Sequence, residues 1–278
     1  MSEENINIAT KEYADAHFGN TSETDDNLVI ATKEYVDSIP TGMVMDGTAL
    51  KGQLCNPQLA TIVGDGADGS TLTDGSYMFY YCANLTSWTA ELPNLTNGSF
   101  MFSWCTNLTS FDATLPKLED GNSMFYYCRK LTSWTVDLPY LTNSIDMFYG
   151  CSGLTTWTAD LPNLENANYM FSSCDKLTSF NAGTEGLKSL TSGSNMFKNC
   201  ILDEASVLHI LNTIPTYTSG THQLHLGKYA NYQTSDKVAA KLRTSTGGTV
   251  STPIPAATNY RCVDDDGNDK GWTITVQA

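Results

Sequence analysis

The segment Met101-Phe102-Ser103-Trp104-Cys105-Thr106-Asn107-Leu108-Thr109-Ser110-Phe111 decides the fold, because its pattern recurs along the middle of the chain. Six cysteines, each preceded by a Met-Phe pair, carry the repeat; the first five lie 23 residues apart and the last follows after 26, at Cys82, Cys105, Cys128, Cys151, Cys174 and Cys200. A unit of this length cannot bury its own apolar face, so the copies must stack on one another.

Within a unit, the spacing of the apolar residues changes from three to two after the leucine that follows the cysteine. This change is typical of a turn that enters a short strand. The alternation directs Trp88 and Ala90 inward and Ser87, Thr89 and Glu91 to solvent. We therefore expect the strands of successive units to form one parallel sheet.

The pattern MFxxCxxLTSW, with the Leu-Pro pair that closes each of the first four units, resembles the BspA-type leucine-rich repeat over residues 76–202. The pattern departs from the usual one in placing Trp or Phe where an aliphatic strand residue is common. The resemblance implies a leucine-rich-repeat solenoid of the α/β repeat class, from a family of surface and adhesive proteins in bacteria and their viruses. It also implies binding and not catalysis.

Both ends of such a stack need atypical units to cover them. Residues 41–75 are expected to be a linker with a degenerate repeat, in which Cys55, Leu59 and Ile62 copy the repeat positions imperfectly. Residues 203–278 are expected to form an α/β carboxy-terminal cap.

The expected cap begins with a helix that Asp203 caps, and the apolar face of this helix holds Val207, Leu208, Leu211 and Ile214. The pattern then predicts a strand around Leu224 and Leu226, a helix over residues 235–243 and a final strand over residues 272–276.

Residues 1–40 contain a different duplication, in which residues 8–15 and 30–37 share the sequence IATKEY. Each copy predicts a short helix with a Thr cap, and helices of about two turns are not stable alone. The segment ATKEYVD is similar to segments of bacteriophage tail-fibre and head-fibre proteins near the virion-proximal end of a homotrimer. This resemblance implies a segment for oligomerisation, or for attachment to other virion proteins.

The 278-residue chain has 30 acidic and 15 basic residues, and a formal net charge of −15. Such a charge repels nucleic acid and anionic membrane, so neither is an expected partner. The first residues show no secretion signal, and no apolar run reaches transmembrane length. We expect a chain that is made in the bacterial cytoplasm and used on a phage particle, without insertion into a membrane.

The two positions between Phe and Cys vary freely while their neighbours hardly change, and in the first four units they include aromatic residues. These residues are the first candidate ligand-binding set: Tyr80, Tyr81, Trp104, Tyr126, Tyr127 and Tyr149. Exposed Tyr and Trp are common anchors in binding surfaces. The alternative is packing against neighbouring coils or against a trimer partner.

A second candidate face follows the solvent side of the strands. Acidic and hydroxyl side chains recur there and could hold sugar hydroxyls or calcium, although a solvated sheet face has the same pattern. The set comprises Thr89, Glu91, Asp112, Thr135, Asp137, Thr158 and Asp160.

Other candidate sites have simpler explanations. The cysteine column lacks any CxxC and is expected to be core packing instead of disulfides or a metal site. His222 and His225 are expected to face solvent, and residues 264–269 to form a hairpin turn before Trp272 and not a calcium loop. Motifs of serine hydrolases, zinc proteases and P-loop enzymes do not occur, so neither catalysis nor a cofactor is expected.

The sequence therefore predicts a bacteriophage fibre or decoration protein whose repeats bind a host-surface glycan or protein. Two alternatives stay open: a purely structural virion component, or a bacterial surface adhesin.

Overall fold

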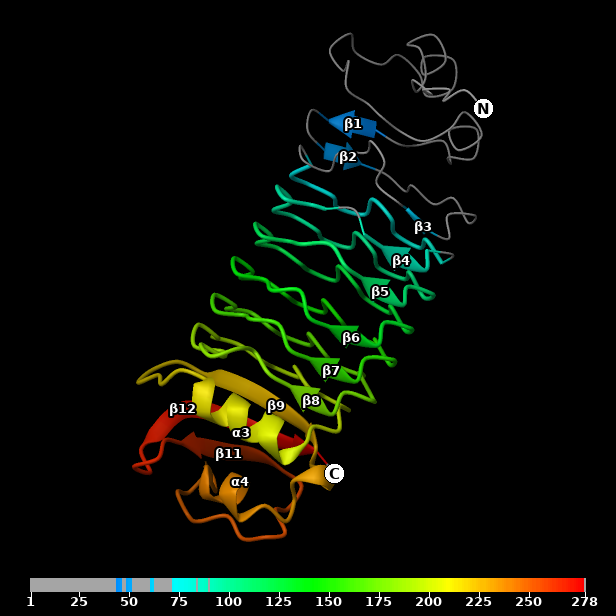
Figure 1. The fold of residues 1–278 in the computed structure, drawn as a ribbon. Coiled ribbons are helices and arrows are strands. Elements are labelled where there is room, and N and C mark those ends of the chain that lie inside the picture. Colours follow the sequence, from blue (N-terminus) through cyan, green and yellow to red (C-terminus); the bar gives the residue numbers. More distant parts are fainter. Residues whose placement is uncertain are drawn as a thin grey trace, which may run out of the picture.

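The computed structural model describes residues 72–277 except 84 and 90, together with three short strands before them. In these residues the repeats form coils that stack into one elongated column, with an α/β unit at the carboxy-terminal end (Figure 1). The three early strands are β1 (Val44–Asp46), which pairs antiparallel with β2 (Ala49–Lys51), and β3 (Thr61–Ile62). The predicted helices of residues 1–40 lie outside the described residues.

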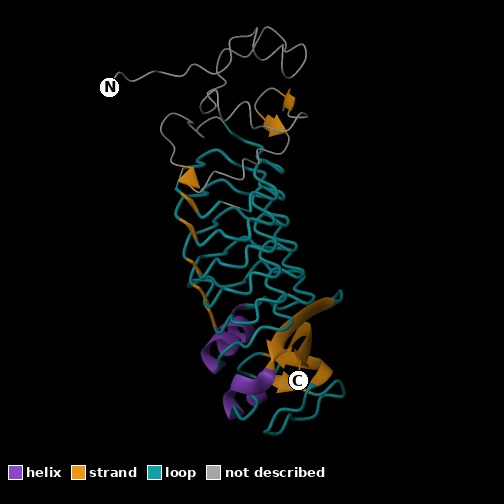
Figure 2. Ribbon diagram, turned by 90° about the vertical axis from the view of Figure 1, so that its right-hand side faces the viewer, coloured by secondary structure: helices purple, strands orange, loops and turns teal. Residues whose placement is uncertain are grey.

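Each of the first five coils contributes a two-residue strand, and these strands line one side of the column (Figure 2). They are β4 (Ser87–Trp88), β5 (Ser110–Phe111), β6 (Ser133–Trp134), β7 (Thr156–Trp157) and β8 (Ser179–Phe180). In every one of them the aromatic residue is buried, which confirms the predicted inward direction. In β3, Ile62 pairs with Trp88, so Ile62 occupies the strand position expected of the degenerate copy.

The prediction of one continuous parallel sheet was wrong. The strands form two three-stranded sheets, in the orders β3-β4-β5 and β6-β7-β8. A second set of parallel bridges on another side of the coils spans this break, and it joins Asp74, Asn97, Asp120, Asn143, Asn166 and Ser192 in turn. Because this second ladder is unbroken, the stacking continues where the first sheet is interrupted.

The ladder positions are held by short polar side chains. The side-chain oxygen of Asn97 accepts the amide of Ser99 at 3.0 Å, and that of Asp120 accepts the amide of Asn122 at 3.0 Å. A side chain that satisfies the backbone two residues later fixes the turn into the next segment. The small polar residues at this corner therefore serve the backbone.

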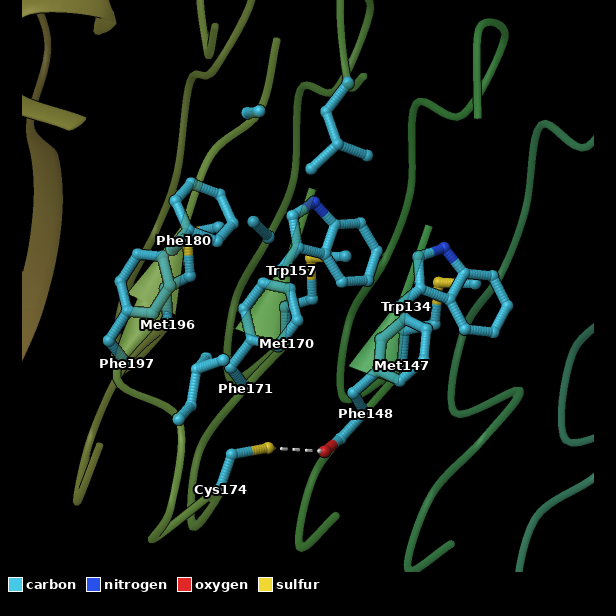
Figure 3. Close-up of a cluster of buried hydrophobic side chains, with 14 of the residues drawn as sticks. Trp134, Met147, Phe148, Trp157, Met170, Phe171, Cys174, Phe180, Met196 and Phe197 are labelled. Carbon is cyan, nitrogen blue, oxygen red and sulfur yellow. Dashed lines mark hydrogen bonds between the residues drawn. The ribbon is translucent and has the colours of Figure 1, made fainter. Parts of the chain in front are cut away.

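Aromatic side chains fill the core in two interlocked columns (Figure 3). Phe125 stacks on Phe148 with ring centroids 5.2 Å apart, and Trp134 stacks on Trp157 at 5.8 Å. Trp134 also meets Phe148 edge to face at 4.9 Å. The indole nitrogen of Trp134 donates to the carbonyl of Val136 at 2.8 Å, so a buried Trp can replace the usual aliphatic residue without an unsatisfied donor.

The cysteines form a third column inside the core. Each thiol from Cys105 to Cys200 donates to the carbonyl of the Met-Phe phenylalanine in the preceding coil, for example Cys105 to Phe79 at 3.2 Å and Cys174 to Phe148 at 3.1 Å. All seven cysteines within the described residues are buried. Burial raises the pKa of the Cys128 thiol well above its ordinary value. The prediction of core packing is confirmed.

The carboxy-terminal unit begins with α3 (Glu204–Thr213), where Asp203 accepts the amide of Ser206 as the predicted cap. It continues with β9 (His222–Lys228), the 3-10 turn η2 (Tyr229–Asn231), α4 (Asp236–Ala240), β10 (Leu242–Arg243), β11 (Ala257–Val263) and β12 (Asp269–Gln277). The sheet order is β10-β11-β12-β9. A bridge between Gly193 and Leu224 carries the second ladder of the coils into β9.

Two elements of this unit differ from prediction. The helix expected over residues 235–243 ends at Ala240, because Leu242 instead pairs with Cys262 of β11. The sequence pattern did not predict β11, since Asn259 has a φ of 77° and the strand register shifts between Ala257 and Tyr260. A bulge of this kind breaks the alternation that reveals a strand.

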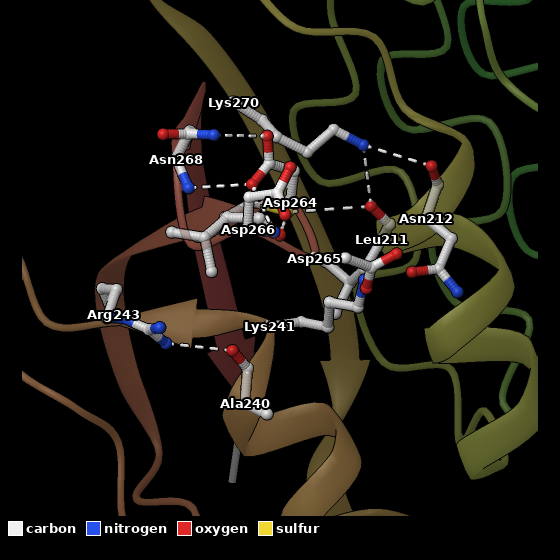
Figure 4. Close-up of polar contacts among 12 residues, drawn as sticks. Leu211, Asn212, Ala240, Lys241, Arg243, Asp264, Asp265, Asp266, Asn268 and Lys270 are labelled. Atoms are coloured by element: carbon white, nitrogen blue, oxygen red, sulfur yellow. Dashed lines mark hydrogen bonds and ion pairs between the residues drawn. The ribbon is translucent and has the colours of Figure 1, made fainter.

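Polar contacts hold the end of α3 and the last hairpin (Figure 4). The ammonium group of buried Lys270 donates to the carbonyls of Leu211 and Asn212, at 3.0 and 3.2 Å. A cation at this end of a helix complements its dipole and unpaired carbonyls. The carboxylate of Asp264 accepts the amide of Asn268 at 2.8 Å, which confirms the predicted hairpin turn before Trp272.

The prediction that both histidines face solvent was wrong. His225 is buried, and its Nδ1 accepts the amide of Gly227 at 3.0 Å. Burial, with the nearby charge of Lys198, lowers the pKa of His225 to about 4. His222 is partly exposed and stacks on Tyr217 with centroids 3.7 Å apart. A strand with one buried and one exposed face alternates between them, but in β9 the residues from Leu224 to Gly227 are all buried. An alternating pattern therefore could not predict the burial of His225.

Candidate functional site

The six aromatic residues predicted as a binding set lie together on the turns between Phe and Cys of the first four coils. We call this set, Tyr80, Tyr81, Trp104, Tyr126, Tyr127 and Tyr149, the aromatic strip. Backbone hydrogen bonds hold its members in register: the amide of Trp104 donates to the carbonyl of Tyr126 at 2.7 Å, and that of Tyr127 to Tyr149 at 2.8 Å. The repeat therefore places one aromatic turn above the next.

The rings of the aromatic strip contact one another from coil to coil. Tyr81 and Trp104 stack with centroids 5.3 Å apart and planes 6° apart, and Trp104 meets Tyr127 at 4.5 Å. Tyr126 stacks on Tyr149 at 5.0 Å. Tyr81 is 48% exposed and the others are partly exposed. Because neighbouring rings cover each other's faces, the strip presents mainly ring edges and hydroxyl groups to solvent.

These contacts are the packing against neighbouring coils that the alternative interpretation expected. The rings also stay partly exposed in each of the four coils. The small residues at these positions behave differently: Ser103 and Ser172, in the column of Tyr126, are buried.

The backbone of the strip is in a conformation that aromatic residues rarely adopt. Tyr81, Trp104 and Tyr127 have φ values of 62°, 64° and 58°, in the left-handed region. A bulky side chain there costs of the order of 1–3 kcal/mol. The same position of the later coils holds small or polar residues, namely Gly150, Ser173 and Asn199.

A second left-handed column was missed by the sequence prediction. Tyr77 and Phe100, each just before a Met-Phe pair, have φ values of 60° and 58°. Their rings stack at 4.7 Å, and Tyr77 meets Tyr80 of the strip at 5.7 Å. The signal that could have revealed the column is the presence of residues that tolerate positive φ at the equivalent positions, Asp146 and Asn195.

Arg129 supplies a positive charge beside the aromatic strip. Its guanidinium carbon lies 4.9 Å from the ring centroid of Tyr127 and 5.9 Å from that of Trp104. Burial, and then the neighbouring Tyr127, raise the pKa of Tyr126 to about 12. At neutral pH the Tyr126 hydroxyl is therefore protonated and can donate a hydrogen bond.

In the coil after Tyr127, the equivalent position holds Gly150, and the aromatic residues of that column end there. A Cβ atom at Gly150 would lie 2.6 Å from the ring of Tyr127, and Gly150 itself has a φ of 70°. The ring of Tyr127 therefore packs directly over the Gly150 backbone, which leaves no room for a side chain at position 150.

Some of the carboxylates on the second candidate face have a structural role. All seven of its residues are exposed. Glu91 accepts the amide of Thr114 at 2.8 Å and also its hydroxyl, which lowers the pKa of the Glu91 carboxyl. Asp137 accepts the amide of Asp160 at 3.0 Å. Two carboxylates thus bind the backbone of the next coil, and the described residues contain no cluster of three or more potential metal ligands.

The comparison with protein families agrees with this architecture. Residues 72–203 match the family described as BspA type leucine rich repeat region, in six copies. The match confirms, for this region, the resemblance to BspA-type leucine-rich repeats that the sequence pattern indicated. No curated protein and no solved structure matches the chain. In the part of the chain that the structure describes, every helix is too short or too polar to cross a bilayer.

Proposed function

We propose that this chain is a binding protein, and not an enzyme, which attaches through the aromatic strip to a glycan or protein of a host-cell surface. The BspA-type repeats support a role in surface adhesion or binding. In this proposal the stacked coils are a leucine-rich-repeat solenoid, and the unit from α3 to β12 is its carboxy-terminal cap.

The observation that carries the proposal is the left-handed backbone of Tyr81, Trp104 and Tyr127. Each such residue costs of the order of 1–3 kcal/mol of conformational energy, and a stacked ring pair returns about 0.5–1.5 kcal/mol. Ser173 and Asn199 adopt the same backbone, with φ values of 63° and 69°, so the fold does not require a ring at this position. Because the same fold accepts Gly150 and Asn199 at this position, contacts outside the chain are the better explanation for the rings.

The dimensions of the strip favour an elongated ligand. Its members occupy four successive coils, and adjacent strands lie about 4.8 Å apart, so it extends over roughly 15 Å. Ring edges and phenol hydroxyls recur along this length, and they suit a ligand with repeated oxygen acceptors. A surface polysaccharide has this character, as does an extended polypeptide.

The test replaces Tyr81, Trp104 and Tyr127 together by Ser, which the fold already accepts at Ser173. We expect the variant to stay folded with a modestly lower melting temperature, because Ser173 already adopts this backbone with a φ of 63° and each lost ring pair contributes only about 0.5–1.5 kcal/mol. Attachment of the purified chain to host cells should fall more than about tenfold, since each anchor contributes more than about 1 kcal/mol.

The matched control replaces three exposed residues of the sheet face, Thr89, Asp112 and Thr135, by Ala. This variant should bind host cells as the parent does. Unchanged binding by the strip variant, with lost binding by the control, would move the site to the sheet face. A collapsed melting curve of the strip variant would show that the rings are core.

We further propose that the protein is a fibre or decoration protein of a phage particle, attached as a homotrimer to other virion proteins through residues 1–40. The support is the repeated segment at residues 8–15 and 30–37, which resembles phage fibre segments. Electron microscopy of particles labelled with an antibody to the chain tests this. Label on tail or capsid supports the proposal, and label on bacterial cells alone would indicate an adhesin. Labelled particles with no cell binding by the chain would indicate a purely structural component.

A further inference from the structure

We propose that Arg129 and the adjacent hydroxyl-bearing edge of the aromatic strip form a subsite for a carboxylate, so that the ligand is an acidic polysaccharide. This inference rests on the proposed function, because it assigns the chemical class of the ligand at the same site.

Ring contacts position the guanidinium of Arg129, and no carboxylate of the described residues pairs with it. It lies against the rings of Tyr127 and Trp104, at 4.9 and 5.9 Å from their centroids. The side chain is exposed, and within residues 72–277 as described it makes no ion pair. Its planar set of N–H donors matches a carboxylate in a bidentate manner, and stacking on the rings restricts the side chain before a ligand arrives.

The fold itself does not call for a cation at this position. The equivalent residues of the neighbouring coils are Thr106, Ser152 and Asp175. The chain carries a net charge of −15, yet Arg129 lies beside the strip and is followed in the sequence by a second exposed cation, Lys130. A local positive pair within a negative protein is a feature that binding of an anion would explain.

The surroundings of Arg129 also favour an oxygen-rich anion. Stacking covers the ring faces, and the exposed edges carry the positive end of the ring quadrupole. The hydroxyl group of Tyr126, which its raised pKa keeps protonated at neutral pH, and that of Tyr127 add hydrogen-bond donors. Asp146, a half-buried carboxylate of the next coil, contributes to the raised pKa of Tyr126 through its charge. The surface next to Arg129 thus presents donors more than acceptors.

The experiment uses an array of bacterial surface polysaccharides, each printed in native form and after chemical reduction of its carboxylates to alcohols. The full chain should bind native acidic polysaccharides at least about tenfold more strongly than their reduced forms, because a charged hydrogen bond contributes about 1.5–3 kcal/mol. The Arg129→Gln variant should lose this preference, and Arg129→Lys should keep part of it. Neither change should move the melting temperature, since the side chain is exposed.

Each result decides between the two proposals. Equal binding to native and reduced polysaccharides, with Arg129→Gln unchanged and the triple strip variant inactive, would overturn the carboxylate subsite and leave the aromatic strip as the site. Attachment to host cells with no binding to any acidic polysaccharide would also overturn the inference, and it would indicate a protein ligand. Full binding by the triple strip variant would overturn the proposed function itself.

Discussion

Gly150 and Tyr127 are coupled through a direct contact, since a Cβ at Gly150 would lie 2.6 Å from the Tyr127 ring. At the scale of single residues, this contact defines the end of the aromatic strip. We expect Gly150→Ala to reduce the free energy of unfolding by about 2 kcal/mol, because the new methyl group meets the ring and the backbone has a φ of 70°. Urea denaturation measures the loss.

The control is the same change in a Tyr127→Ser background. There the ring is gone and only the backbone strain remains, so the loss should be smaller by about 1 kcal/mol. An equal loss in both backgrounds would mean that the ring does not lie over Gly150.

His225 makes stability depend on pH in a defined window. Its pKa of about 4 in the folded chain lies below the ordinary value of 6.5, mainly because the ring is buried. The unfolded chain therefore takes up a proton first, so stability is fully present above pH 6.5 and declines as the pH falls towards 4. The difference is up to about 3 kcal/mol.

Denaturation at pH 7 and pH 4 should show this loss in the parent chain and a smaller loss in His225→Asn. Asn keeps an acceptor for the amide of Gly227, which His225 accepts at 3.0 Å, but it does not titrate. His209 is also partly buried with a lowered pKa, and it is present in both chains, so it cancels in the comparison. Identical losses in parent and variant would assign the acid sensitivity to other groups.

At the scale of the elements, each two-residue strand depends on the rings that its neighbours place around it. Trp134 of β6 stacks on Phe111 at 5.3 Å and on Trp157 at 5.8 Å, and it is almost fully buried. Trp134→Ala should cost roughly 3–5 kcal/mol, because the coils on both sides lose contacts.

Chemical denaturation checks this value against Tyr140→Ala, which removes a ring that is 58% exposed and should change stability by less than about 0.5 kcal/mol. A loss below about 1 kcal/mol for Trp134→Ala would contradict the packing of the strand aromatics described above.

Elements that repeat were predictable, and elements that do not repeat were predictable only in part. The period of 23 residues sets the strand aromatics, the cysteine column and the location of the aromatic strip, since each coil must meet the next with the same contacts. The break between β5 and β6 has no counterpart in the sequence pattern, and nothing in the described residues explains it. The left-handed turns escaped prediction because Tyr81 and Trp104 are residue types that seldom mark such turns.

The two ends of the molecule along its long axis carry different features. The aromatic strip occupies the first four coils, and the unit containing α3 and β12 covers the other end of the column (Figure 1). Beyond Gly150 the strip positions hold Ser173 and Asn199. A ligand on the strip would therefore contact the half of the repeat stack that lies nearer to residues 1–40 in the chain.

Assembly is a property of the whole chain. We expect residues 1–40 to drive oligomerisation, because each of the two short helices predicted there is too short to persist alone. Light scattering should find an oligomer for the full chain and a monomer for residues 41–278. A monomeric full chain would leave docking on another protein as the role of residues 1–40.

The central claim is that the aromatic strip contacts the ligand, and the tryptophans provide a direct test. Of the five in the chain, only Trp104 lies on the strip and is partly exposed, whereas Trp88, Trp134, Trp157 and Trp272 are buried. Fluorine NMR of the chain labelled with fluorotryptophan, with and without host-cell envelope material, should show one signal that shifts or broadens. That signal should be the one missing from the Trp104→Phe variant. Binding of the envelope material with all five signals unchanged would contradict the claim.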